Sequence, residues 1–140
     1  INPGFGRLIM ASGAITVAIA PGELIDKITI LAIKLERIDD AAKLENIRRE
    51  MEFLAQTRAE GLPETDELEA LTQGLKDVNE RLWQIEDDIR ACEAAGDFGP
   101  RFIELARAVY INNDERARAK RAINELLGSD IIEEKSYQPY

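Results

Sequence analysis

The chain has 140 residues, of which 45% are hydrophobic and 32% are charged, a size and balance that fit one domain with a single core. Its net charge of −9 and pI near 4.6 argue against non-specific nucleic-acid binding and against anionic membrane surfaces, because phosphate groups would repel it. It has no histidine and one cysteine, which excludes histidine-based catalytic triads, histidine- or thiolate-ligated zinc and an internal disulfide.

The N-terminal segment shows two different patterns. Residues 1–9 contain Pro and Gly without any periodicity, and Met10 is a plausible natural start, so we expect residues 1–9 to be a non-native or disordered extension. Residues 14–20 alternate Ile15, Val17 and Ile19 with small residues, which predicts a short strand. Its partner would be residues 129–137 or the same strand of a second subunit.

Four helices follow in chain order. The first begins at Pro21 and runs to Ile38, with apolar residues at spacings of three and four. The second follows the capping pair "DD" at 39–40 and ends before the loop at 60–65. The third starts after Thr65, its predicted N-cap, and ends at 95–100; the fourth starts near Pro100 and ends at Gly128, a predicted C′ cap.

The third helix has the clearest pattern, a seam of apolar residues that resembles a coiled coil. The seam consists of Leu68, Leu71, Leu75, Val78, Leu82, Ile85, Ile89 and Cys92. Short loops make neighbouring helices antiparallel. We therefore predict one all-α domain over residues 1–140, an antiparallel bundle of two short and two long helices with a tail at 129–140 packed on it.

The stretch "VYINNDERARAKRAIN", residues 109–124, places Asn113, Arg116 and Lys120 on the face that should point to the core. Three interpretations are open. The cations pair with acids of the first or third helix, such as Asp26 or Glu86; or "INND" breaks the helix and Asn113 caps a new one; or the residues bind a small anionic ligand. The ligand site would consist of Tyr110, Asn113, Arg116, Lys120 and Arg121.

Carboxylates offer the only metal chemistry that the composition leaves open, with Mg²⁺, Mn²⁺ or Ca²⁺ as the ion. "ELID" at 23–26 and "ERID" at 36–39 each put two carboxylates on one helical face, as in all-α Mg²⁺-dependent nucleotide pyrophosphohydrolases. With 27 acidic residues in the chain, such short motifs also arise by chance on solvated faces. In this alternative the metal ligands are Glu23, Asp26, Glu86 and Asp87.

A stripe beside the apolar seam combines Trp83 with Asn79, Glu86 and Arg90. A tryptophan in such surroundings usually packs against its neighbours and makes one hydrogen bond. The alternative role for Trp83 is to stack on a bound ligand.

Long segments of the chain resemble a family of small uncharacterised bacterial helical proteins, known only as a domain of unknown function. The similar segments are "GELIDKITILAIKLERI", "NERLWQIEDDIR", "RFIELARAVYINNDERARAKRAIN" and "EEKSY". The resemblance covers about residues 15–140. It implies a link to cell-surface polysaccharide synthesis, and it carries over no catalytic residue.

The sequence favours a non-catalytic, cytoplasmic interaction or assembly protein that forms a homodimer and needs no cofactor, since a seam and an unpaired strand call for partners. The alternatives are a Mg²⁺-dependent nucleotide or phosphate-ester hydrolase, and a protein that binds a sugar phosphate or nucleotide. We expect no membrane or nucleic-acid partner.

Overall fold

The computed structural model describes residues 13–140, which form four α-helices with connecting segments and a C-terminal tail. The helices are α2 (Pro21–Arg37), α3 (Ala41–Gly61), α4 (Asp66–Ala95) and α5 (Pro100–Leu126). The all-α prediction is confirmed. The predicted extension at residues 1–9 lies outside the residues that the structure describes.

The helix ends follow from local chemistry. Asp40 caps α3 by accepting a hydrogen bond from the Lys43 amide at 2.8 Å, and the Thr65 hydroxyl caps α4 by accepting one from the Leu68 amide at 3.1 Å. Pro21 and Pro100 open α2 and α5, where a missing N–H costs no helical hydrogen bond. Gly128 has a φ of 62° just beyond α5, as its predicted C′ role requires.

The predicted strand at residues 14–20 is wrong for the single chain. Residues 13–20 include no strand, and the side chains of Ile15 and Val17 are 81% and 67% exposed. A strand needs a partner with free backbone groups. One of the two expected partners, residues 129–137, instead lies against α5 through side-chain ion pairs.

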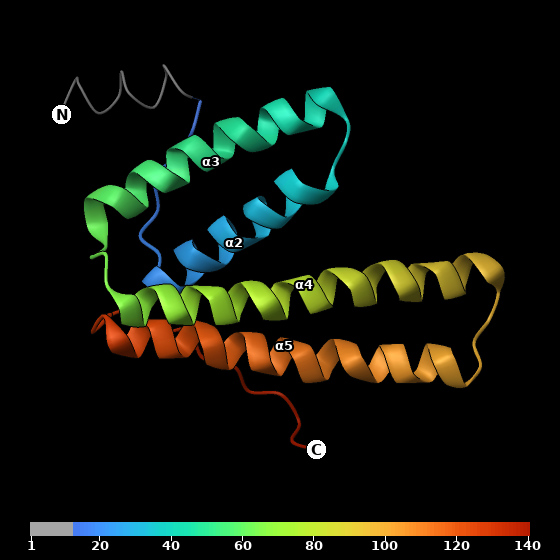
Figure 1. Ribbon diagram of the computed structural model, residues 1–140. Coiled ribbons are helices and arrows are strands. Elements are labelled where there is room, and N and C mark those ends of the chain that lie inside the picture. The colour runs from blue at the N-terminus through green and yellow to red at the C-terminus, as the bar shows by residue number, and fades with distance from the viewer. Residues whose placement is uncertain (1–12) are drawn as a thin grey trace.

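The helices are arranged around α2. Helices α4 and α5 form a long antiparallel pair, α2 crosses this pair obliquely, and α3 lies on the far side of α2 (Figure 1). Within residues 13–140, α3 packs on α2, is linked to α4 by the 3.7 Å ion pair of Arg58 with Glu69, and has no fully buried residue. The fold therefore differs from a regular four-helix bundle, in which each helix packs on two neighbours.

The core is small and lies where α2, α4 and α5 meet. Ile25, Leu68, Leu75 and Ile123 are each at most 1% exposed and form one cluster. In α4 the fully buried residues all lie between Leu68 and Asn79, so the second half of this helix has none. Among residues 13–140, no helix is both long and apolar enough to cross a membrane.

The backbones of α2 and α5 come close together at Gly22. A Cβ atom at this position would lie 2.3 Å from the backbone oxygen of Lys120 and 2.8 Å from the side-chain oxygen of Asn124. The Gly22 amide donates a 2.7 Å hydrogen bond to that same Asn124 oxygen. Only a residue without a side chain allows this contact.

We predict that Gly22→Ala lowers the free energy of unfolding by about 2–3 kcal/mol, because the helix backbones must move apart. Gly74→Ala is the matched control, since Gly74 lies in α4 with nothing within 4 Å of an added Cβ. That control should raise stability by about 0.5–1 kcal/mol. Chemical denaturation measures both, and equal effects of the two substitutions would contradict the close contact.

Candidate functional site

Helix α5 is continuous through the unusual stretch at residues 109–124. The predicted break at "INND" is therefore wrong. Asn113, the residue expected to cap a new helix, lies inside α5. The neighbouring Asn112 amide donates to the Ala108 carbonyl one turn earlier, at 2.8 Å, and its oxygen accepts from Arg81 of α4 at 3.1 Å. These contacts keep the asparagine side chain on the surface of an intact helix.

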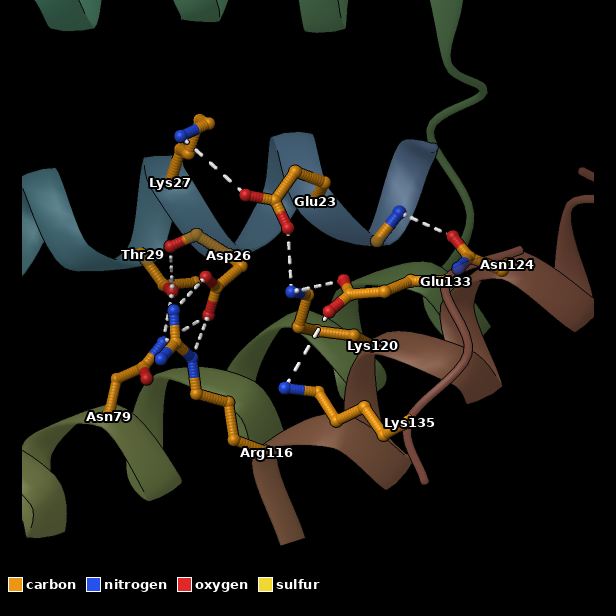
Figure 2. A network of polar contacts seen from close by, with 11 residues as sticks. Glu23, Asp26, Lys27, Thr29, Asn79, Arg116, Lys120, Asn124, Glu133 and Lys135 are labelled. Carbon is orange, nitrogen blue, oxygen red and sulfur yellow. Dashed lines mark hydrogen bonds and ion pairs between the residues drawn. The ribbon is translucent and has the colours of Figure 1, made fainter. Parts of the chain in front are cut away.

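The polar face of α5 meets a buried carboxylate of α2. Asp26 is 1% exposed, and Arg116 binds it with two hydrogen bonds, Nε to Oδ1 at 2.9 Å and Nη2 to Oδ2 at 2.5 Å (Figure 2). This fork geometry is the strongest form of arginine–carboxylate pair. The prediction that a cation of this stretch pairs with an acid of the first or third helix is confirmed.

Helix α4 completes the surroundings of Asp26. The Asn79 amide donates to Asp26 Oδ1 at 2.9 Å and to Thr29 Oγ1 at 3.0 Å, and the Thr29 hydroxyl donates to the Asp26 backbone oxygen at 2.8 Å (Figure 2). Among the residues that the structure describes, no buried side-chain nitrogen or oxygen lacks a hydrogen-bond partner. The network thus joins three helices without an unsatisfied polar group.

The charges of this network set its ionisation. Burial raises the pKa of Asp26, but the hydrogen bonds from Arg116 and Asn79 and the attraction of Arg116 and Lys120 outweigh it, so the pKa lies below its ordinary value. The hydrogen bond to Asp26 raises the pKa of Arg116 against the opposing effect of burial. Both groups are therefore charged at neutral pH.

A second ion pair lies one turn along α5. Lys120 Nζ is 2.6 Å from Glu23 Oε2 and 3.0 Å from Glu133 Oε2, so it connects α5 to α2 and to the C-terminal tail (Figure 2). Burial lowers the pKa of Lys120, but the bonds to Glu23 and Glu133 more than compensate and raise it. Arg121, on the outer side, pairs with Glu125 and with Glu134 of the tail.

A groove opens beside the Asp26 network, between α2, α4 and α5. Its cavity has a volume of about 520 Å³ and an apolar lining from all three helices. That lining consists of Ile30, Ile33, Leu82, Trp83 and Val109. The polar lining brings together residues from all three sequence hypotheses: Asn79, Glu86, Asp87, Arg90, Asn113 and Arg116.

Some polar side chains of the groove already have partners within the chain, and others do not. Glu86 accepts a 2.7 Å hydrogen bond from Arg90, and the guanidinium of Arg37 lies 5.9 Å from the Trp83 ring centre. Within residues 13–140, the side chains of Asp87 and Asn113 make no hydrogen bond or ion pair. The groove therefore offers an aromatic ring, a free carboxylate and a free amide to a partner.

The five predicted ligand residues do not converge on one cavity. Arg116 lines the groove, Lys120 and Arg121 line a small cavity beside the tail, and Tyr110 lies on the outer face of α5. Asn113 borders both the groove and the outer hollow. Three of the five residues, Arg116, Lys120 and Arg121, already have carboxylate partners.

The four predicted metal ligands are not brought together either. Within residues 13–140, no three acidic or cysteine side chains lie close enough to bind one metal ion. Glu23 pairs with Lys120, Asp26 with Arg116, and Glu86 with Arg90. Cations of the protein thus pair with three of the four carboxylates, so the geometry gives the magnesium hypothesis no support.

Thr29 and Asn124 are network residues that the sequence analysis missed. Thr29 is a β-branched residue within a helical pattern, and Asn124 continues the polar face of Asn113 and Lys120 by one more turn. The position of Asn124 on this polar face is the one feature of the sequence that indicates its role, because it continues the row of amide and cationic side chains toward the start of α2.

The fold and these contacts define an all-helical protein whose junction of three helices is held by a buried polar network. The chain belongs to a family of unknown function, DUF6165, whose model matches residues 15–140. No curated protein and no solved structure matched the chain.

The two ion pairs should respond differently to loss of the cation. Arg116→Met leaves Asp26 buried without a counter-charge and should lower the free energy of unfolding by about 3–5 kcal/mol. Lys120→Met keeps the side-chain volume and leaves Glu23 and Glu133, 29% and 47% exposed, in contact with water, so stability should stay within about 1 kcal/mol of wild type. Denaturant unfolding measures both, and a larger loss for Lys120→Met would refute this ranking.

The depressed pKa of Asp26 predicts acid sensitivity. The pair contributes its full stability above the unfolded-state pKa of about 3.9, and that contribution is lost as the pH falls toward the lower folded-state pKa. As the pH falls below about 5, roughly one unit above the unfolded-state pKa, the wild type should lose more unfolding free energy than Asp26→Asn. Glu52→Gln, an exposed substitution on α3, should follow the wild-type slope; an equally steep slope for Asp26→Asn would contradict the assignment.

Proposed function

We propose that the protein is a non-catalytic helical interaction protein that forms a homodimer through the end of the α4–α5 pair. We name residues 84–112, the part of this pair beyond its crossing with α2, the distal arm. The cytoplasm is the setting we propose, because the single cysteine fits a reducing compartment.

The observation that carries the proposal is the uncovered length of the α4–α5 pair. Helix α4 has 30 residues and α5 has 27, whereas α2 has only 17. At 1.5 Å per residue, α4 is about 45 Å long and α2 about 25 Å. The arm continues alone past α2 to the turn at 96–99 (Figure 1).

The distal arm exposes several large apolar side chains to solvent. Phe98 and Ile103 are 54% and 56% exposed, and Ile85, Ile89 and Phe102 are only half-buried between the two helices. A two-helix hairpin cannot enclose a core, but two such hairpins pack into a four-helix bundle. A second copy of the arm would cover the face that α2 covers nearer the core.

The charges on this face favour a second copy as the partner. Asp87 is free within residues 13–140, and Arg90 is 76% exposed and bound only to Glu86 of its own helix. In a dimer with two-fold symmetry, each copy presents the same acid and base to the other, so both contacts form twice. The groove beside the arm offers Trp83 as a central anchor of the kind that dominates interfaces.

We predict that the protein sediments as a dimer and that Arg90→Glu weakens the dimer at least about tenfold, since it places a third acid beside Glu86 and Asp87. The control is Arg48→Glu on α3, an exposed arginine without an ion pair among residues 13–140. It should leave the dimer constant unchanged.

Sedimentation equilibrium measures the association, and the emission of Trp83, the only tryptophan, reports on the groove. Dissociation on dilution should shift this emission to longer wavelength. A mass of 15.7 kDa at every concentration, or equal effects of the two arginine substitutions, would contradict the proposal.

A further inference from the structure

The C-terminal tail is attached to α5 at two separate places. Near its start, Glu133 binds Lys120 at 3.0 Å and Glu134 binds Arg121 at 3.3 Å. At its end, the Tyr140 hydroxyl donates to Asp114 Oδ2 at 2.7 Å. The Tyr140 ring also meets the Tyr110 ring edge to face, with centres 5.1 Å apart.

Between these attachments, the tail and α5 line a hollow of about 1070 Å³ that is open to solvent. Residues 135 and 137–140 form one wall, and α5 residues between Val109 and Arg118 form the other. A hollow of this size is at the upper end of the range for small-molecule sites. It lies on the outer face of α5 and does not depend on the proposed dimer.

The apolar part of the lining is mainly aromatic. All three tyrosines of the chain, Tyr110, Tyr137 and Tyr140, line the hollow, together with Pro139. Tyr137 and Tyr140 are 77% and 79% exposed, so their rings gain little from packing within the chain. Exposed aromatic rings around one hollow provide faces on which a planar ring can stack.

The polar part of the lining carries positive charge. Arg118 and Lys135 are its cations, and Asp114, which accepts the Tyr140 hydrogen bond, is its one acid. Among residues 13–140, Arg118 makes no ion pair, whereas Lys135 lies 3.6 Å from Glu133 and beside the Tyr137 ring. The side chains that line the hollow thus carry one more positive charge than negative, in a chain of net charge −9.

Asn113 adds a free amide to the same wall, since its side chain makes no hydrogen bond within residues 13–140. In the anion-binding interpretation of residues 109–124 the cations were Arg116, Lys120 and Arg121, all of which have carboxylate partners. The cation left available on α5 near Tyr110 and Asn113 is instead Arg118.

We propose that this hollow binds a small molecule with an aromatic ring and a phosphate group, of the size of a nucleoside monophosphate. The ring stacks on the tyrosines, Arg118 and Lys135 bind the phosphate, and the Asn113 amide bonds to a polar edge of the ligand. An arginine fork and a lysine that line one hollow suit a doubly charged phosphate. The net negative charge of the whole chain disfavours a long polyanion.

The test is calorimetric titration of the full chain with adenosine and uridine monophosphate. Inorganic phosphate and adenosine are the comparison probes, because each carries only half of the proposed chemistry. At least one nucleotide should bind about tenfold more tightly than either comparison probe. Binding of inorganic phosphate as tight as that of the nucleotides would overturn the proposal, and so would no nucleotide binding up to about 1 mM.

Variants locate the site. Arg118→Gln and Tyr137→Ala, both at exposed positions, should each weaken the nucleotide about tenfold. The control is Arg107→Gln, which removes another exposed arginine of α5 that has no ion pair among residues 13–140 and does not line the hollow. It should bind like wild type. Unchanged affinity in both test variants, or an equal loss in the control, would overturn the proposal.

Discussion

The structure depends on neutralising one buried carboxylate. Asp26 lies on the inner face of α2, where water cannot reach it. An ionised carboxylate in such a place costs several kcal/mol unless a cation and hydrogen-bond donors surround it. Arg116 of α5 supplies the charge and Asn79 of α4 supplies a further donor. One acid therefore requires residues from two other helices, and these requirements explain why α5 has polar residues where its flanks are apolar.

Such a pair contributes more to geometry than to net stability, because the cost of desolvation offsets much of the attraction. Apolar helix faces alone tolerate a slip of one turn, since leucine and isoleucine pack in similar ways at neighbouring positions. A two-point bond between Asp26 and Arg116 does not tolerate such a slip. The contact at Gly22 acts in the same direction, since the backbones of α2 and α5 meet there without an intervening side chain. We infer that these two contacts set the register of α2 on the long pair.

The sequence predicted the helices well and their packing less well. Caps, prolines and apolar spacing are local signals, so the ends at Thr65, Pro100 and Gly128 could be located without a structure. The position of α3 in the fold could not be predicted in this way, because a repeat of half-buried apolar residues does not indicate how many neighbouring helices a helix packs against. The prediction of a strand at 14–20 was wrong for a related reason, since the alternation of apolar and small side chains does not indicate whether a partner strand is present.

The candidate site could also be predicted only in part. The sequence indicated that Arg116 and Lys120 face inward and need acids, and Asp26 was among the acids considered. It could not indicate which cations remain available, because this depends on the acid that lies opposite in space. Glu133 and Glu134 of the tail neutralise Lys120 and Arg121, while Arg118, on the same helix, has no acid partner within residues 13–140.

The position of α3 on the outside of the fold has a consequence for local unfolding. Within residues 13–140 this helix packs on α2, has one ion pair to α4 through Arg58 and Glu69, and buries no residue completely, so little apolar area holds it in place. A segment with few buried contacts opens at a lower free energy than the core it covers. The amide hydrogens of α3 would then exchange with solvent through a separate, low-energy opening while the Asp26 network stays intact. In that open state the outer face of α2 becomes accessible, and the protein acquires a second apolar helix surface that the closed state hides.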